Sequence, residues 1–301
     1  MFKKQEYLAY LAAKNFSPMT LEARRIHLNR FYKWLSDQSI KDMRCVTTSR
    51  LQEYQYYLFS DYRTVRGEKI SVGTVLARLT ALRGYFGYLA EQKYILLDPA
   101  KNLLFPKKEY RLPKNLLNQE EVKSLLNSPG DRIMDLRDKA ILETLYSTGI
   151  RSAELCKLNV YDVNLNDQTV RIIDAKGKKD RILPIGNMAK EALERYLLYS
   201  RAKIVRDMSD QTLFLTQYGT KMVRQSLIHV IKTYAQKMRL NKPVTTHSLR
   251  HAFATHLLQN GADIITVQRL LGHTKLETTQ IYTKVTMEDL RSAIKKHHPR
   301  Y

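Results

Sequence analysis

The chain of 301 residues carries 51 lysines and arginines against 29 aspartates and glutamates, which gives a formal net charge of +22. With 44% hydrophobic and 27% charged residues, its composition excludes a disordered or low-complexity protein. The length indicates two domains, and the positive charge indicates a polyanionic partner, either nucleic acid or an anionic membrane surface.

Neither membrane insertion nor secretion is indicated. No segment approaches the roughly 18 apolar residues that span a bilayer, and residues 1–16 lack an apolar stretch followed by a cleavage site. Cys45 and Cys156 are the two cysteines and stand far apart, so neither a disulfide framework nor a cysteine zinc site is expected. We therefore expect a reduced, cytoplasmic protein that has no membrane partner.

Residues 1–97 predict a bundle of four or five short helices. Ser17 followed by Pro18 is typical of a helix start. Apolar side chains at three- and four-residue spacing then share one helix face: Leu21, Leu28, Phe31 and Leu35. Further helices are expected over 49–59 and 72–91, and the clustered Tyr54, Tyr56, Tyr57 and Tyr62 are expected in the core or facing the nucleic acid.

Residues 98–113 predict an extended linker, because Pro99, Pro106 and Pro113 cannot continue a helix. Positive charge lies on both sides of it. Residues 1–113 hold 20 basic and 10 acidic side chains, and residues 114–301 hold 31 and 19, so the net charges are +10 and +12. This even division favours two domains that both contact the nucleic acid and form a clamp around it.

Residues 114–301 predict a second domain that is mainly α with a small β element. Asn118 with Glu121 predicts one helix start, and a second helix over 131–147 is expected to end at Gly149. Strands over 169–174 and 181–185 are expected to form a hairpin with Gly177 in its turn. Later helices are expected over 188–205, 222–238, 248–259, 264–271 and 287–295.

The pattern His-x-x-Arg lies within 246–258. His247 and Arg250 are three residues apart, so on a helix their side chains project to the same side. They lie near the beginning of the expected helix, where free backbone N–H groups and the helix dipole favour an anion. The pair predicts a phosphate site, although a histidine at such a position is by itself more often structural than catalytic.

Three more segments make this pattern specific: TGIRSAEL at 148–155, AKG at 175–177 and LLGHTKLETTQIYTKV at 270–285. Together they resemble the tyrosine recombinase (phage integrase) family, and within it the Xer-like site-specific recombinases. The family's active-site residues correspond, in order, to Arg151, Lys176, His247, Arg250, His273 and Tyr282. The resemblance covers the whole chain and implies a SAM-like core-binding domain (1–97) followed by a mixed α/β catalytic domain (114–301).

The residue types suit cleavage of a phosphodiester. Arg151 and Arg250 can stabilise the non-bridging oxygens, because a guanidinium is always charged and binds phosphate through two donors. A lysine at a hairpin tip can protonate the leaving 5′ oxygen, and Lys176 is chosen over Lys178 and Lys179 from the family's pattern.

The resemblance implies that Tyr282 attacks phosphorus and forms a 3′-phosphotyrosine. Rejoining then needs neither ATP nor a metal. His247 is the expected partner for the phenol proton, and His273 is expected to donate a hydrogen bond to the phosphate. Glu154, three residues after Arg151, is expected to orient the site.

No cofactor is expected. Two-metal nucleases need clustered carboxylates, and the acidic residues here are scattered. His247, His251 and His256 could suggest zinc, but the glutamate of a His-Glu-x-x-His motif is missing and Arg250 would repel a cation.

The resemblance implies a homotetramer, or a heterotetramer with a paralogue, that exchanges strands at a specific core site of double-stranded DNA through a Holliday junction. A C-terminal exchange helix at about 286–296 would dock on a neighbouring protomer, or else cover its own domain. The location is expected to be the cytoplasm, at a prokaryotic nucleoid. Chromosome or plasmid dimer resolution, mobile-element integration and accessory or motor proteins remain open. The alternatives are type IB topoisomerase-like relaxation and a catalytically silent DNA-binding relative.

Overall fold

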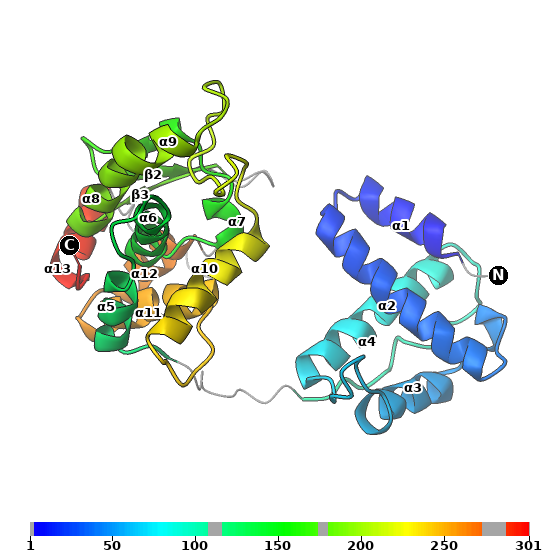
Figure 1. Cartoon of the computed structure of the whole chain (residues 1–301). Coiled ribbons are helices and arrows are strands. Elements are labelled where there is room, and N and C mark those ends of the chain that lie inside the picture. Colours follow the sequence, from blue (N-terminus) through cyan, green and yellow to red (C-terminus); the bar gives the residue numbers. More distant parts are fainter. Residues whose placement is uncertain (1–2, 108–115, 174–179, 273–286, 301) are drawn as a thin grey trace. The chain divides into compact units, whose positions relative to one another are not determined.

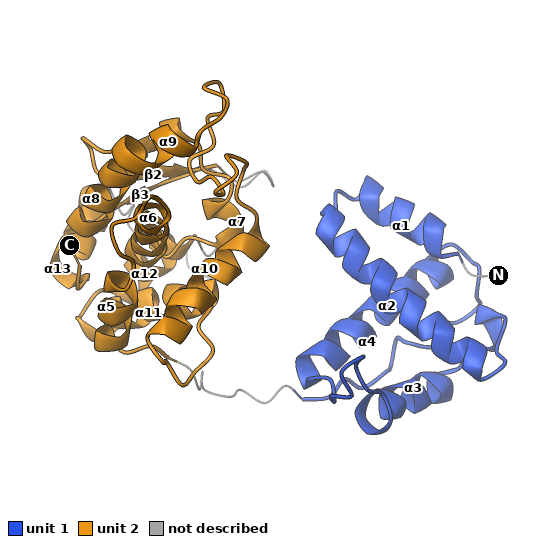
Figure 2. Cartoon of the chain, viewed as in Figure 1, with its two compact units in different colours: residues 1–111 blue, residues 112–301 orange. Residues whose placement is uncertain are grey.

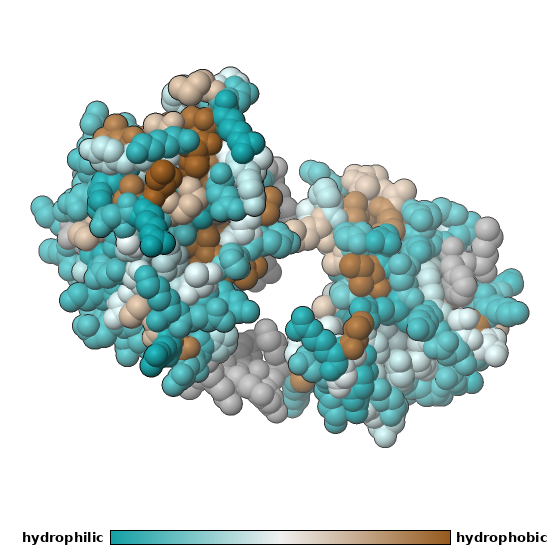
Figure 3. Space-filling view, in the orientation of Figure 1, coloured by the Kyte–Doolittle hydropathy of each residue, from teal (hydrophilic) through white to brown (hydrophobic). Residues whose placement is uncertain are grey.

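The computed structural model describes residues 3–107, 116–173, 180–272 and 287–300. The chain divides into two compact units, residues 1–111 and 112–301 (Figure 2). Each unit has its own hydrophobic core. Within the described residues, no helix is both long and apolar enough to cross a bilayer. Hydrophilic residues cover most of the face of each unit seen in Figure 3.

Unit 1 is a bundle of helices with one 3₁₀ turn, η1 (Figure 1). Along the chain these are α1 (Lys4–Ala13), α2 (Pro18–Asp37), η1 (Met43–Cys45), α3 (Thr48–Ser60) and α4 (Val72–Glu91). The helix starts follow from side-chain caps, because Ser17, Thr47 and Ser71 each accept a hydrogen bond from the backbone N–H three residues later. The start predicted at Ser17 and the limits predicted for α4 are confirmed.

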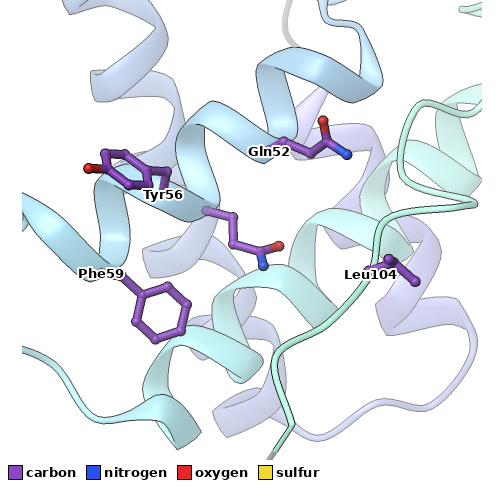
Figure 4. Close-up of a pocket in the computed structure, with 5 residues that line it drawn as sticks. Gln52, Tyr56, Phe59 and Leu104 are labelled. Atoms are coloured by element: carbon purple, nitrogen blue, oxygen red, sulfur yellow. The ribbon is translucent and has the colours of Figure 1, made fainter.

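Aromatic rings fill the core of unit 1. Phe31 packs edge-on against Tyr54 and Phe86, with ring centroids 4.9 and 6.0 Å apart, and all three rings are buried. The outer face of α3 forms a shallow cavity of about 250 Å³ with the chain that follows α4. Figure 4 shows its lining, which has no acidic or basic side chain: Gln52, Gln55, Tyr56, Phe59 and Leu104.

Unit 2 is built around α6, which lies at its centre among α5, α8 and α11 (Figure 1). In chain order its elements are α5 (Gln119–Asn127), α6 (Ile133–Thr148), α7 (Ser152–Leu155), a 3₁₀ turn η2 (Val160–Asp162), β1 (Val163–Asn164), β2 (Thr169–Ile172), β3 (Arg181–Pro184), α8 (Asn187–Arg195), a π-helical turn η3 (Tyr196–Arg201), α9 (Ala202–Ile204), α10 (Arg224–Lys237), α11 (Thr246–Gln259), α12 (Ile264–Leu271) and α13 (Met287–His297).

The predicted hairpin is present as β2 and β3, which pair antiparallel with Ile172 opposite Arg181. Its predicted turn at Gly177 lies outside the described residues. The two-residue strand β1 adds a third strand that the sequence pattern did not predict, so the order is β1-β2-β3. The chain is thus mainly α with a small antiparallel sheet, as expected.

Some helix limits differ from the predictions. The single helix expected over 188–205 is three successive pieces, α8, the π-helical turn η3 and α9. The π turn is held by tertiary contacts, because the Tyr196 hydroxyl donates to the carbonyl of Leu213 and the Ser200 hydroxyl donates to the carbonyl of Ile133. The short helix α7 was not predicted, and it carries part of the candidate site.

The C-terminal helix α13 packs against α11, α12 and β3 of its own unit. Ile294 is fully buried there, and Leu290 packs against the same core. In this structure the apolar face of α13 therefore covers its own domain, which is one of the two arrangements expected from the sequence.

Candidate active site

Arg151 lies where the chain turns from α6 into α7. Gly149 ends α6 with a left-handed conformation, φ +61°. A β-carbon at this position would lie only 2.5 Å from the ring of Phe253, so glycine is required by both backbone and space. The turn places Arg151 immediately before α7, with its side chain 41% exposed. Arg151 can therefore reach a ligand from solvent.

Glu154 holds Arg151 through two hydrogen bonds. The backbone N–H of Arg151 donates to Glu154 Oε2 at 2.8 Å, and Arg151 Nη1 donates to Glu154 Oε1 at 2.9 Å. Glu154 lies three residues after Arg151 at the start of α7, and at this spacing a glutamate side chain can reach back to the residue that precedes the helix. Glu154 is therefore placed to fix the guanidinium of Arg151, which agrees with its expected orienting role.

Arg250 is the buried arginine of the site. It lies on α11 with 9% exposure, and its Nη1 and Nη2 donate to the carbonyls of Gly149 at 2.6 Å and Leu271 at 2.7 Å. These bonds join α11 to the ends of α6 and α12. Burial and the nearby charge of Arg151 lower the pKa of Arg250 to about 10, so it remains charged at neutral pH.

A third arginine, which the sequence motifs do not mark, completes the group. Arg181 is the first residue of β3, and its Nη1 and Nη2 donate to the two carboxylate oxygens of Glu154 at 3.1 and 2.8 Å. We call Arg151, Arg181, Arg250 and Glu154 the arginine cluster. Its formal charge is +2. Burial acts to raise the pKa of Glu154, but the hydrogen bonds from Arg181 and Arg151 outweigh it and hold that pKa below its usual value.

The end of α12 closes the arginine cluster. Gly272 caps α12 with φ +64°, and its carbonyl lies 3.5 Å from Arg151 Nη2. The next residue in the sequence is His273. Chemically, the cluster offers guanidinium donors, a positive charge and a partly exposed position, which together suit an oxyanion such as phosphate.

The structure thus brings together two of the six predicted site residues, Arg151 and Arg250. His247 is exposed in the first turn of α11, which begins after the capping residue Thr245, two residues earlier than the predicted helix. Lys176, His273 and Tyr282, like the alternatives Lys178 and Lys179, lie outside the described residues.

The histidines that could have suggested zinc are not arranged for it. His256 is 1% exposed, and both of its ring nitrogens are engaged, Nδ1 with the Tyr146 hydroxyl and Nε2 with the carbonyl of Leu117, each at 2.9 Å. His251 is exposed on the same helix. Within the described part of the chain, no group of three histidine, cysteine or acidic side chains could hold a metal ion.

Comparison with known proteins assigns both units to one family. Residues 115–289 match the phage integrase family, and residues 5–93 match the phage integrase N-terminal SAM-like domain. The chain is 39% identical to the tyrosine recombinase XerC 2 of Ralstonia nicotianae, covering 96% of this chain and 83% of that protein. It is also 39% identical to the tyrosine recombinase XerD of Pasteurella multocida, covering 95% and 94%.

Solved structures agree in fold. A XerH site-specific recombinase bound to a palindromic difH substrate superposes with a TM-score of 0.72 at 24% identity, covering 93% of this chain and 80% of that one. A XerA recombinase is 27% identical over 99% of both chains, with a TM-score of 0.50.

The fold, the arginine cluster and these matches show that the chain belongs to the phage integrase family. Its relatives over nearly the full length are Xer proteins. The chain is accordingly a tyrosine-type site-specific DNA recombinase.

Proposed function

We propose that the arginine cluster binds the scissile phosphate of duplex DNA and stabilises the negative charge that develops during strand cleavage. The observation that carries this proposal is the meeting of three guanidiniums with one carboxylate, at a partly exposed position between α7, α11 and β3. The excess of two positive charges complements a phosphodiester, which gains negative charge in the transition state.

In the proposed step, the phenolic oxygen of Tyr282 attacks phosphorus and forms a 3′-phosphotyrosine, while the bond from phosphorus to the 5′ oxygen breaks. The phenol proton passes to His247, and the departing 5′ oxygen takes a proton from Lys176. His273 donates a hydrogen bond to the phosphate. Rejoining is the reverse attack by a 5′ hydroxyl, so the step consumes no nucleotide.

The charge of the cluster also supports the proposal that the reaction uses no metal. Arg151 and Arg250 present fixed positive charge where a nuclease would use bound cations, and within the described residues Arg250 donates to backbone carbonyls. We propose that cleavage proceeds in the presence of a chelator and without ATP.

The partner is proposed to be double-stranded DNA with a specific core site, bound in the cytoplasm by four protomers on two duplexes. The subunits would be identical or include a paralogue. If α13 docks on a neighbouring protomer in that assembly, Ile294 must leave the core that it occupies in this structure. The recombinase names of the relatives favour this proposal over supercoil relaxation or silent binding.

Covalent capture tests the nucleophile. Purified protein is incubated with fragmented genomic DNA of its source, with EDTA present, and the mixture is denatured with detergent. Fragments linked to protein are then sequenced. We expect one recurring site in the captured DNA and none with Tyr282→Phe. Attachment that persists in Tyr282→Phe would show that another residue is the nucleophile.

The same capture distinguishes the alternatives. Fragments without a shared sequence, together with relaxation of a supercoiled plasmid, would indicate a topoisomerase-like activity. Specific retention of DNA without covalent linkage would indicate a silent DNA-binding relative.

A further inference from the structure

Arg181 occupies an unusual position for a strand residue. Its side chain is only 17% exposed, and it makes a two-contact ion pair with Glu154, whose side chain is 12% exposed. Within the described part of the chain, its buried Nε has no hydrogen-bond partner. A buried donor without a partner costs about 1–3 kcal/mol, so the arrangement calls for a compensating role.

That role follows from the shared carboxylate. Glu154 accepts four hydrogen bonds, two from Arg151 and two from Arg181. If Arg151 were its sole partner, the pair would be neutral and the carboxylate would hold Arg151 away from an anion. Because Arg181 supplies a second positive charge to Glu154, Arg151 keeps its charge available for phosphate.

Arg181 also supports the end of α12. A β-carbon on Gly272 would lie 3.0 Å from Nε and Cζ of Arg181, so the guanidinium packs directly against the glycine. The carbonyls beside this contact face the other two arginines: that of Gly272 faces Arg151, and that of Leu271 accepts from Arg250. Arg181 thereby borders the same backbone turn that holds both phosphate-binding candidates.

We propose that Arg181 is a positioning residue for strand cleavage, which acts by neutralising Glu154 and supporting Gly272 so that Arg151 and Arg250 stay aimed at the phosphate. It does not contact the DNA itself. The inference rests on the proposed function, since it assumes that the arginine cluster binds the scissile phosphate.

The first experiment separates rate from affinity. Single-turnover formation of the covalent complex and the DNA dissociation constant are measured on the captured site for wild type, Arg181→Gln and Arg181→Lys. We expect the cleavage rate of Arg181→Gln to fall about 10- to 100-fold, because small displacements of catalytic groups have effects of this size. Arg181→Lys should recover part of it, and DNA affinity should change less than threefold.

Arg171→Gln is the matched control. Arg171 lies on the neighbouring strand β2, 54% exposed, and pairs with Asp162 rather than Glu154. Its loss removes the same charge from the same sheet. It should leave the cleavage rate within about twofold of wild type, since Arg171 is itself largely exposed and its partner Asp162 is not part of the arginine cluster.

The double variant Arg181→Gln/Glu154→Gln tests the route through Glu154. The glutamine at position 154 keeps an oxygen that can accept from Arg151 but removes the negative charge that Arg181 neutralises, so the double variant should cleave about tenfold faster than Arg181→Gln alone. A merely structural role for Arg181 predicts the opposite, a double variant at least as slow as the single one. That outcome, or wild-type cleavage by Arg181→Gln, would overturn the inference. A wild-type protein that forms no covalent complex would instead overturn the proposed function and this inference together.

Discussion

In the proposed function, Arg250 binds phosphate while it also holds two backbone segments together. Two of its donors are used on the carbonyls of Gly149 and Leu271, which leaves its remaining donors for a ligand. A buried guanidinium that is tied in this way is already oriented before DNA arrives. This preorganisation is the reason to assign Arg250 to charge stabilisation rather than to general affinity.

Arg250→Lys should therefore lose activity although it keeps the charge. One ammonium group cannot donate to both carbonyls and to the phosphate in the geometry that the guanidinium provides. We therefore expect the single-turnover cleavage rate to fall about 100- to 1,000-fold. The unserved carbonyls should also lower the free energy of unfolding of unit 2 by about 1–3 kcal/mol. Cleavage within threefold of wild type would contradict the assignment.

The sequence predicts which residues belong to the site better than it predicts how buried they are or what they contact. The spacing of His247 and Arg250 predicts a shared helix side, but it does not reveal that Arg250 is buried while His247 is exposed. Arg181 was missed because its importance comes from a contact with Glu154 across 27 positions of sequence. Its one local signal is a basic residue at the start of a predicted strand.

The turn at the end of α6 fixes the position of Arg151. Gly149→Ala must place a methyl group in a left-handed turn and against Phe253. Gly261 is a matched control in the same unit, because its φ is +92° and a β-carbon there would meet only His297 at an ordinary 3.8 Å.

Both substitutions should lower the free energy of unfolding of unit 2 by about 1–2 kcal/mol, because alanine is strained in a left-handed backbone conformation. Gly149→Ala should cost about 1–3 kcal/mol more for the overlap with Phe253, and it should also slow cleavage. Urea unfolding followed by circular dichroism measures the difference. The single tryptophan, Trp34, lies in unit 1, so its fluorescence follows that unit separately. Equal costs for the two variants would contradict the packing argument.

The C-terminal segment after α13 is held by a buried histidine. His298 Nε2 donates to the carbonyl of Tyr146 at 3.2 Å, and the backbone N–H of Arg300 donates to His298 Nδ1 at 3.3 Å. Both contacts fit the neutral ring. Burial outweighs the contact with Tyr146, and the charge of Arg300 acts in the same direction, so the pKa of His298 falls to about 4.

This depressed pKa makes stability depend on pH in one direction. Above pH 6.5 His298 is neutral in both states, and its contribution is complete. As pH falls from about 6.5 towards 4, the unfolded chain gains a proton that the folded chain does not, so we expect a loss of about 2 kcal/mol between pH 7.5 and pH 5.

His298→Gln keeps a donor and an acceptor but cannot be protonated. Between pH 7.5 and pH 5, the free energy of unfolding of unit 2 should therefore fall by about 2 kcal/mol less in His298→Gln than in wild type. The control His251→Gln, which changes an exposed residue, should show the same fall as wild type. An identical fall in His298→Gln and wild type would show that protonation of His298 does not cause the loss of stability.

Helix limits were predictable where a capping side chain in the sequence sets them. Ser71 caps α4, and the predicted and observed limits of that helix coincide. The π turn at Tyr196–Arg201 was not predictable, because its wider hydrogen bonding is held by contacts with Leu213 and Ile133 rather than by local propensity. Strand β1 exists only through pairing with β2.

The charge of +22 is divided almost evenly along the chain, with +10 on residues 1–113 and +12 on residues 114–301. Few of the 51 basic residues belong to the arginine cluster. We expect many of the others to contact the DNA backbone, and such contacts carry affinity but no sequence information.

Binding to DNA that lacks the captured site should therefore depend steeply on salt. If the two units neutralise about 6–10 phosphates, the affinity should fall by about 10³ to 10⁵ between 50 and 200 mM salt. Titration of a labelled duplex at several salt concentrations measures the slope. A slope near zero would show that the charge serves another purpose. Arg250→Lys should keep the wild-type slope, because the charge is unchanged.

Recombination between two directly repeated copies of the captured site on one supercoiled plasmid is the decisive test of the proposed strand exchange. We expect the wild-type protein to convert the plasmid into two smaller circles without ATP and with EDTA present, and we expect no product with Tyr282→Phe and very little with Arg250→Lys. Resolution by Tyr282→Phe at the wild-type rate, or relaxation of the plasmid without any resolution, would contradict it.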